Sequence, residues 1–152
     1  MSSHALRFLL VFRRSQDSAN PIWRIMLAHM REKYGLEIPR QANIGAGLYL
    51  GHAFNITINS ATTVGRNCNI HKGVTIGQEN RGKRKGAPSI GDEVWIGVNA
   101  TIVGGIKVGS DVLIAPGSYV NCDVPDHSIV LGNPCRVIPR ENATEGYINR
   151  RV

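Results

Sequence analysis

Two histidines have the residue type and the setting to do chemistry in this 152-residue chain. His52 lies in the stretch Leu50-Gly-His-Ala-Phe-Asn, and His71 lies in Ile70-His-Lys-Gly-Val-Thr. Because an imidazole titrates near neutral pH, either ring could take a proton from a hydroxyl group as a general base. We take His52 as the catalytic candidate and His71 as a candidate second active-site histidine. The alternative for each is a surface histidine at a corner of the fold, and it has more weight for His71.

A six-residue repeat surrounds these histidines and must position them. From Ile90 to Pro125 an aliphatic residue opens each of six units: Ile90, Ile96, Ile102, Val108, Ile114 and Val120. A period of six fits neither a helix nor a simple alternating strand. It is typical of a β-helix, in which short strands joined by tight turns are wound into a coil. A small residue, Gly or Ala, follows four of the six aliphatics, and we expect it to let the backbone turn, often at positive φ.

The same frame extends upstream with two slips. It runs through Ile38, Ile44, Leu50 and Ile56, then through Ile58, Val64, Ile70 and Ile76, and breaks again over residues 77–89. With three units to a coil, the frame predicts three aliphatic stacks. Neighbouring coils are expected to lie about 4.8 Å apart, the usual distance between hydrogen-bonded strands. The stacks are Leu50, Ile70, Ile96 and Ile114; Ile44, Val64, Ile90 and Val108; and Ile58, Ile76, Ile102 and Val120. This register places His52 and His71 near each other.

The frame divides the chain into a helical segment at residues 1–36, a β-helix at 37–138 and a C-terminal tail at 139–152. A first helix is expected over Ala5–Arg14, with a break at Ser15–Ser18. Asn20 is expected to cap a second helix that Gly35 ends. The helices are expected to cap the open end of the coil or to contact another subunit. The alternative is an interfacial helix at a membrane, because basic and bulky apolar residues alternate.

Composition narrows the classes of partner. The net charge of +7 permits nucleic acid, an anionic membrane face or a phosphorylated cofactor. Nucleic acid is disfavoured because the four aromatic residues of 38–138 are not interleaved with basic residues. The three cysteines have no CxxC spacing, so we expect a reduced cytoplasmic protein without a disulfide framework or a zinc site. The longest apolar run, residues 8–12, is too short to cross a bilayer, and we expect no signal peptide.

The longer frame slip contains a basic loop, Gln78–Pro88. It holds Arg81, Lys83, Arg84 and Lys85. One interpretation is an ordinary solvated loop. The other is an arm over a groove that holds an anionic substrate or cofactor.

The six-residue frame, the two histidine stretches, the long loop and the closing Gly132-Asn-Pro-Cys-Arg-Val-Ile resemble the hexapeptide-repeat acyltransferases. The closest subgroup is the serine acetyltransferases and the related O-acetyltransferases of surface-polysaccharide synthesis. The resemblance covers about residues 37–138. It implies a mainly β fold, a left-handed parallel β-helix, with acetyl-CoA as donor and a homotrimer or a multiple of three as the assembly. The left hand is implied by the resemblance, since general topology rules favour right-handed crossovers.

The resemblance also assigns site residues. His52 matches the catalytic base of the family, and Glu37, fifteen positions earlier, matches the acid that orients it. Positions equivalent to groove contacts with acetyl-CoA are Val98, Pro116 and Asn121, with Arg136 as a cation for the phosphates and Lys83 and Lys85 as further candidates. The expected reaction is direct transfer of the acetyl group to a hydroxyl, with no covalent enzyme intermediate and no metal.

Departures from the serine enzymes decide the expected acceptor. Those enzymes carry Asp just before the base and an Arg-His pair in the loop, where this chain has Gly51, Gly86 and Ala87. Because an amino acid needs charged partners and a sugar hydroxyl does not, we expect a sugar of a surface polysaccharide or its precursor, handled near the inner face of the membrane. The alternatives are serine O-acetyltransferase, and a non-catalytic or carbonic-anhydrase-like β-helix. The zinc-containing form of the latter is disfavoured because only His52 and His71 are suitably placed.

Overall fold

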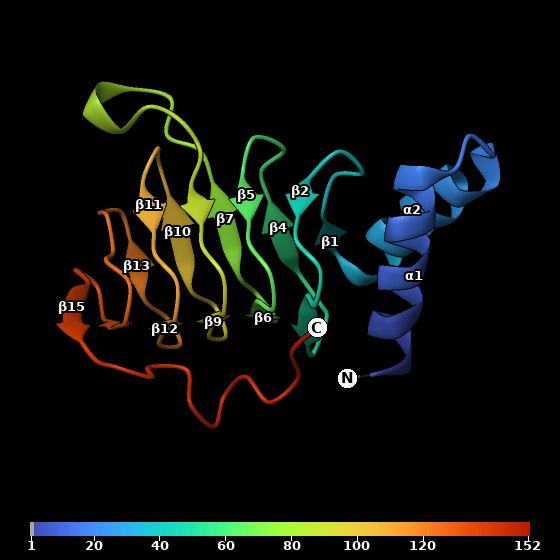
Figure 1. The fold of residues 1–152 in the computed structure, drawn as a ribbon. Helices are drawn as coiled ribbons and strands as arrows, with labels where there is room; N and C mark the ends of the chain where they lie inside the picture. Colours follow the sequence, from blue (N-terminus) through green and yellow to red (C-terminus); the bar gives the residue numbers. More distant parts are fainter. Residues whose placement is uncertain (1) are drawn as a thin grey trace.

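A computed structural model describes residues 2–152 and winds most of them into a left-handed parallel β-helix of about 5 turns. Three parallel sheets form the sides of the coil (Figure 1). Sheet A contains β1 (Leu36–Glu37), β4 (Ile56–Ile58), β7 (Thr75–Gly77), β10 (Thr101–Val103) and β13 (Tyr119–Val120). Sheet B contains β2 (Asn43–Ile44), β5 (Thr63–Val64), β8 (Ser89–Ile90) and β11 (Lys107–Val108).

Sheet C is the longest side of the coil. It contains β3 (Tyr49–Gly51), β6 (Asn69–His71), β9 (Val94–Ile96), β12 (Val112–Ile114), β14 (Ser128–Leu131) and β15 (Arg136–Pro139). All its strands are parallel except β15, which pairs antiparallel with β14. This reversal turns the chain back on itself and ends the coil.

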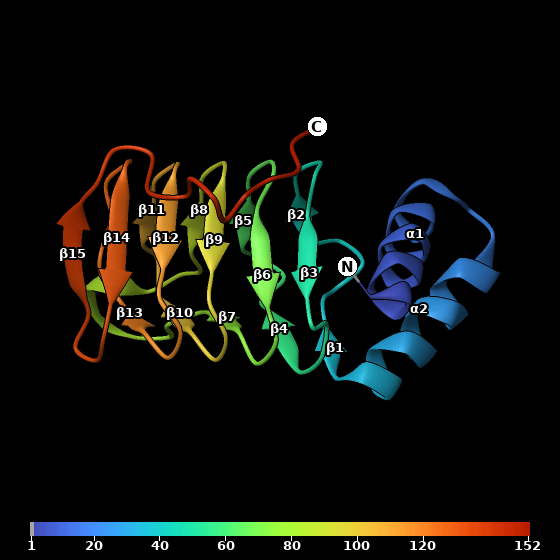
Figure 2. The ribbon, with the colours of Figure 1, turned by 90° about the horizontal axis from the view of Figure 1, so that it is seen from below.

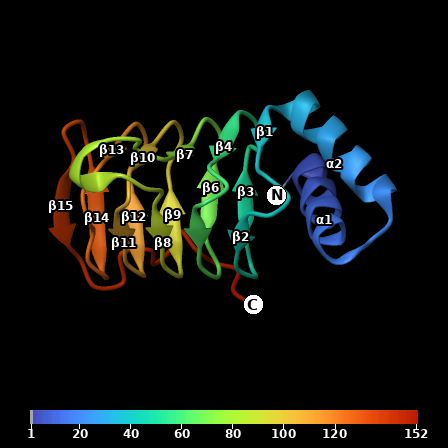
Figure 3. The same ribbon diagram turned by 90° about the horizontal axis from the view of Figure 1, so that it is seen from above.

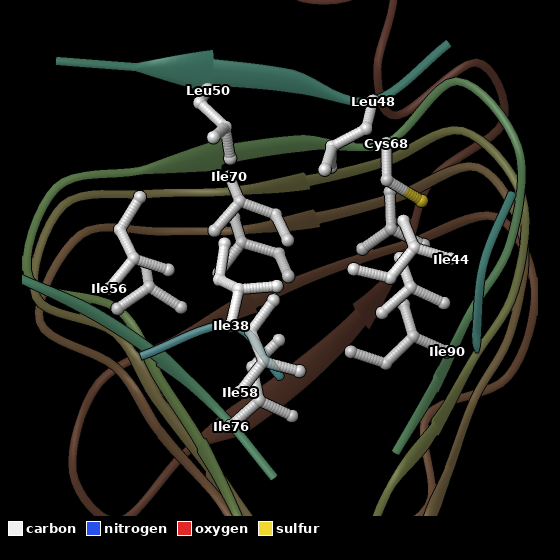
Figure 4. Close-up of a cluster of buried hydrophobic side chains, with 14 of the residues drawn as sticks. Ile38, Ile44, Leu48, Leu50, Ile56, Ile58, Cys68, Ile70, Ile76 and Ile90 are labelled. Atoms are coloured by element: carbon white, nitrogen blue, oxygen red, sulfur yellow. The ribbon is translucent and has the colours of Figure 1, made fainter. Parts of the chain in front are cut away.

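The predicted aliphatic stacks are confirmed by the strand register. Ile70 pairs with Leu50 on one side and Ile96 on the other, and Ile114 follows Ile96. The stacks through Val64 and Ile76 have the expected members too. These side chains fill the interior of the coil (Figure 4), and each full burial contributes about 1.5–3 kcal/mol.

The small residues after the aliphatics have a different role from the one expected. Gly45, Gly65, Gly91 and Gly109 are absent from the backbone positions with positive φ. A Cβ atom on Gly65 would instead clash with the carbonyl oxygen of Gly91 in the next coil. Close approach between coils therefore requires glycine, and the positive φ values fall on corner residues such as Asn55, Asn67 and Asn99.

Two helices precede the coil, α1 (Ser3–Asp17) and α2 (Pro21–Tyr34). As predicted, the Asn20 side chain accepts a hydrogen bond from the Ile22 N–H at 3.0 Å, and Gly35 ends α2 in the left-handed region. The break expected over Ser15–Ser18 falls at the end of that range, because α1 continues to Asp17 and Ser18 is its C-cap. Ser15 is buried within α1, where its hydroxyl donates to the Phe12 carbonyl.

The helices cap the open end of the coil, as the first interpretation predicted. Phe8, Phe12 and Leu27 belong to the same core cluster as the coil interior. The Arg13 guanidinium donates to the carbonyls of Ile44 and Gly45 at 2.7 and 2.6 Å, which ties α1 to the first turn. Within residues 2–152, no helix has the length and apolar character needed to span a bilayer.

The C-terminal tail runs back along the outer side of sheet C toward β3 (Figure 2). Thr144 anchors it, because its N–H and hydroxyl both donate to Asp111. Further along, Arg151 forms an ion pair with Glu93 at 2.9 Å, and the Val152 N–H donates to the Asn67 side chain. The tail is therefore packed against several successive turns of the coil.

Candidate functional site

The edge between sheets C and A carries the candidate base. His52 follows β3, Lys72 follows β6, Val98 follows β9 and Pro116 follows β12. Backbone hydrogen bonds join these turns: the Lys72 N–H donates to Gly51, the Asn99 N–H to Lys72 and the Gly117 N–H to Val98. The register thus places His52 on the same edge as two of the predicted groove residues, Val98 and Pro116.

The turn that holds His52 is braced by the N-terminal helices. His52 has φ of 51°, a conformation uncommon outside glycine and often found at functional sites, and its side chain is exposed. The Asn55 N–H donates to the Tyr34 carbonyl at 3.0 Å. His4 of α1 lies 3.2 Å from the Ala53 carbonyl and stacks on Tyr34. The helices therefore position the base as well as capping the coil.

His71 lies next to His52, as the register predicted. It pairs with Gly51 across β3 and β6. Partial burial lowers the pKa of His71, and the neighbouring His52 lowers it further, so His71 is neutral at pH 7. Its Nε2 atom is buried and has no hydrogen-bond partner among the described residues.

The His71 ring occupies the space beside Gly51. A Cβ atom on Gly51 would clash with the His71 Nδ1 atom, so any side chain there would displace the ring. The resemblance implies Asp at this position in the serine enzymes, whereas this chain has Gly51 with the His71 ring against it.

Glu37 lies on β1, the first strand of the coil. It is exposed on β1, where it lines a hollow with Arg31 and Glu32 of α2. Within residues 2–152, no hydrogen bond or ion pair links its carboxylate to the His52 ring. Its role in orienting the base stays a prediction.

The remaining predicted groove residues lie on both edges of sheet A. Asn121 follows β13 at the edge opposite His52. Arg136 begins β15 and pairs with Leu131 at the end of β14, on the same edge as Pro116 and at the last turn of the coil. Lys83 and Lys85 are exposed on the basic loop, which leans toward the β13 end of the coil (Figure 3). One chain therefore does not gather all six residues at one place. Across residues 2–152, no three His, Cys, Asp or Glu side chains are grouped to hold a metal ion.

A second group of residues near His71 was not expected from the sequence. Tyr49, Asn69 and Trp95 point outward from sheet C, and Tyr147 of the tail lies against Trp95 with ring centroids 5.0 Å apart. Tyr49 and Trp95, which directly precede Leu50 and Ile96, are large residues in a repeat of small and aliphatic ones, and this could have drawn attention to them. Tyr147 lies outside the repeat, and no sequence pattern indicated its position.

Comparisons with known proteins agree with the β-helix fold and its repeat. Residues 87–122 match the family model of the bacterial transferase hexapeptide (six repeats). Serine acetyltransferase 4 of Arabidopsis thaliana is 37% identical over 111 residues, which are 73% of this chain and 31% of that protein. The serine acetyltransferase of Neisseria gonorrhoeae in complex with serine has a TM-score of 0.75 at 33% identity, covering 89% of this chain and 57% of that one.

A Brucella abortus serine acetyltransferase in complex with coenzyme A has a TM-score of 0.79 at 27% identity, covering 91% of this chain and 57% of that one. The repeat, the fold and these relatives show that the chain belongs to the hexapeptide-repeat transferases. The relatives from Arabidopsis thaliana and Staphylococcus aureus that it matches are serine acetyltransferases. The chain spans between 31% and 53% of the length of the first curated relatives it matches.

Proposed function

We propose that the chain is an acetyl-CoA-dependent O-acetyltransferase with His52 as its general base. The observation that carries the proposal is the shared edge: His52, Val98 and Pro116 follow strands of sheet C on one edge of the coil. A linear donor lying along that edge would bring its thioester to the base. The relative solved with coenzyme A supports the choice of donor.

The chemistry follows from the imidazole. His52 accepts the proton of the acceptor hydroxyl while that oxygen attacks the thioester carbonyl, and the thiolate of coenzyme A leaves. Donor and acceptor react directly, so the protein supplies no covalent nucleophile. His71 is neutral and adjacent, and it offers a hydrogen bond to the acceptor rather than a charge.

Serine is the acceptor that the relatives support. The curated relatives are serine acetyltransferases, and one solved relative holds serine. The expected sugar acceptor is not confirmed by these comparisons, which favour the serine alternative.

A sugar hydroxyl is the second candidate, and one observation favours it. The acceptor side of His52 has the His71 ring against Gly51 where the serine enzymes have an aspartate. Gly86 and Ala87 likewise carry no charge. Loss of such charged contacts costs about 1.5–3 kcal/mol for each hydrogen bond, or roughly one to two orders of magnitude in affinity.

Steady-state kinetics test the proposal. Release of coenzyme A would be measured with L-serine and, separately, with methyl pyranosides. Turnover of about 1 per second or more with a Michaelis constant at or below about 1 mM marks a real substrate. Such values for L-serine establish the first candidate, and values of this kind for a pyranoside establish the second. If neither acceptor accelerates release beyond hydrolysis, the transferase proposal fails.

We also propose a homotrimer or a multiple of three. The support is the separation of the groove candidates: Val98 and Pro116 lie on one edge of sheet A, and Asn121 lies on the other. Neighbouring subunits could join two such edges into one groove. Light scattering at low micromolar protein should give a mass of three or six chains, and a fully active monomer would contradict the shared groove.

A location near the membrane stays a proposal, supported by the exposed Leu6, Leu10 and Ile25 of the helices.

A further inference from the structure

A hollow lined by aromatic residues lies on the outer side of sheet C, beneath the tail. We call it the aromatic hollow, and it is lined by Tyr49, Asn69, His71, Trp95, Tyr147, Asn149 and Arg150. Its volume is about 240 Å³, below the roughly 300–1,000 Å³ of sites for drug-sized ligands. It can therefore hold one ring, and it is too small for a coenzyme or an oligosaccharide.

The walls suit a ring with apolar faces. The His71 and Trp95 centroids are 4.7 Å apart at an interplanar angle of 51°, and Trp95 meets Tyr147 at 63°. Tilted rings form a concave wall rather than two parallel plates. A flat base would stack between parallel faces, whereas the puckered face of a pyranose, made of C–H groups, can pack into a curved aromatic wall.

The polar atoms of the hollow suit hydroxyl groups. His71 lines the hollow, and its Nε2 atom, which is covered in the empty hollow, has no hydrogen-bond partner among the described residues. A buried polar atom without a partner is unfavourable. Asn69 donates through its Nδ2 to the Tyr147 carbonyl at 3.1 Å, which leaves its Oδ1 open as an acceptor. Because burial lowers the pKa of His71, the ring is neutral and can donate to or accept from a hydroxyl.

The charges of the hollow disfavour a free amino acid. Arg150 is at its rim, and no Asp or Glu belongs to its lining among the described residues. An ammonium group would therefore enter without a counter-ion, which is unfavourable. A neutral polyol needs none.

We propose that the aromatic hollow binds a pyranose ring and presents one of its hydroxyls to His52. The link to His52 is the His71 ring, which forms a wall of the hollow and rests on Gly51, the residue before His52. The binding stands on the hollow alone, whereas the presentation to the base rests on the proposed transferase function. If both hold, the acceptor is a sugar rather than serine.

The binding is tested without acetyl-CoA, so that its result is separate from that of the transferase. In a Trp23→Phe protein, Trp95 is the one tryptophan left and reports on the hollow. Its emission would be titrated with methyl α-D-glucopyranoside, methyl α-D-galactopyranoside and methyl α-D-mannopyranoside, with sorbitol as an acyclic polyol. We expect a saturable change with at least one pyranoside and none with sorbitol.

Variants then locate the binding. Tyr49→Ala and Tyr147→Ala should each raise the pyranoside concentration at the midpoint of the titration by about tenfold. A tenfold change corresponds to the loss of an aromatic contact of ~1.4 kcal/mol. Tyr119→Ala changes a half-buried tyrosine of sheet A, away from the hollow, and should leave the midpoint unchanged. Circular dichroism would confirm that each variant is folded. If Tyr49→Ala and Tyr147→Ala both bind like the parent protein, the hollow is not the site.

The outcomes separate the two proposals. Pyranoside binding with acetylation of the same pyranoside supports both. Binding with transfer only to L-serine supports the hollow as a site and overturns its role in presenting the acceptor. The absence of any saturable change, with transfer to L-serine intact, overturns the hollow and leaves the transferase standing.

Discussion

The inner side of sheet C carries an aliphatic stack, Leu50, Ile70, Ile96 and Ile114, whereas the neighbouring outward positions carry Tyr49, Asn69, Trp95 and Leu113. The inner residues are alike in type and all fully buried. The outer residues differ from turn to turn in size and polarity. Burial is therefore concentrated in the repeated side, and the proposed recognition lies on the side that departs from repetition.

The largest expected effect comes from truncating the inner side. Ile96→Ala removes a fully buried side chain from the middle of a stack, and we expect it to lower the free energy of unfolding by about 2–5 kcal/mol. Leu131→Ala, a position 38% exposed on the same sheet, should change it by about 0.5 kcal/mol or less. Denaturant unfolding at one fixed protein concentration would measure both. Equal losses in the two variants would remove the distinction between the sides.

A smaller effect is expected where the tail crosses the outer side. Asp111 accepts hydrogen bonds from the Ala143 and Thr144 N–H groups and from the Thr144 hydroxyl. Asp111→Asn should weaken the attachment of the tail by about 1.5–3 kcal/mol, the range for hydrogen bonds to a charged group. Amide hydrogen exchange at residues 143 and 144 would measure it. Asp123→Asn, whose side chain accepts from the Lys107 N–H instead, should leave these two amides unchanged.

The hydrogen bonds between Asp111 and the tail also predict that the attachment of the tail depends on pH. Partial burial alone would raise the pKa of Asp111, but hydrogen bonds from His127, Thr144 and Ala143 hold it below its ordinary value of 3.8. The hydrogen bond to Asp111 raises the pKa of His127 above 6.5. The contribution of Asp111 to the stability of the attached tail is present above pH 3.8 and is lost as the pH falls through the lowered pKa of Asp111. The contribution of His127 to the same stability is complete below pH 6.5 and is lost as the pH rises through the raised pKa of His127.

Protection of the tail amides should therefore be greatest between about pH 4 and 6.5. Exchange rates, corrected for the intrinsic effect of pH, would measure this protection. His127→Ala should abolish the decline above neutral pH and keep the decline in acid. A decline above neutral pH that persists in His127→Ala would assign it to another group.

The inner side of sheet C could be predicted from the sequence, and most of the outer side could not. The period of six was enough to predict the three stacks, their register and the nearness of His52 and His71, because burial repeats at every turn. The path of the tail was not predictable, since the contact between Thr144 and Asp111 joins residues far apart in sequence and has no period. Trp95 and Tyr49 were visible as exceptions in the repeat, but their common wall with Tyr147 required the tail.

The smallest expected effect lies outside sheet C, at the start of α2. Asn20→Ala removes the acceptor of the Ile22 N–H, and it should lower the free energy of unfolding by about 0.5–2 kcal/mol. Glu32→Ala, at an exposed position of the same helix, is the control and should change it by about 0.5 kcal/mol or less. Thermal unfolding of both would show whether the helical cap contributes as an ordinary capped helix. A loss as large as that of Ile96→Ala would mean that Asn20 contributes more than the single capping hydrogen bond accounts for.

The central claim is that His52 is the general base on the edge shared with Val98 and Pro116. The most direct measurement is turnover of His52→Ala beside His71→Ala, with the better acceptor and saturating acetyl-CoA. We predict that His52→Ala lowers turnover by roughly 10²–10⁴-fold with acetyl-CoA affinity unchanged, and that His71→Ala retains more activity. Near-normal turnover in His52→Ala, together with an inactive His71→Ala, would contradict the account and assign the base to His71.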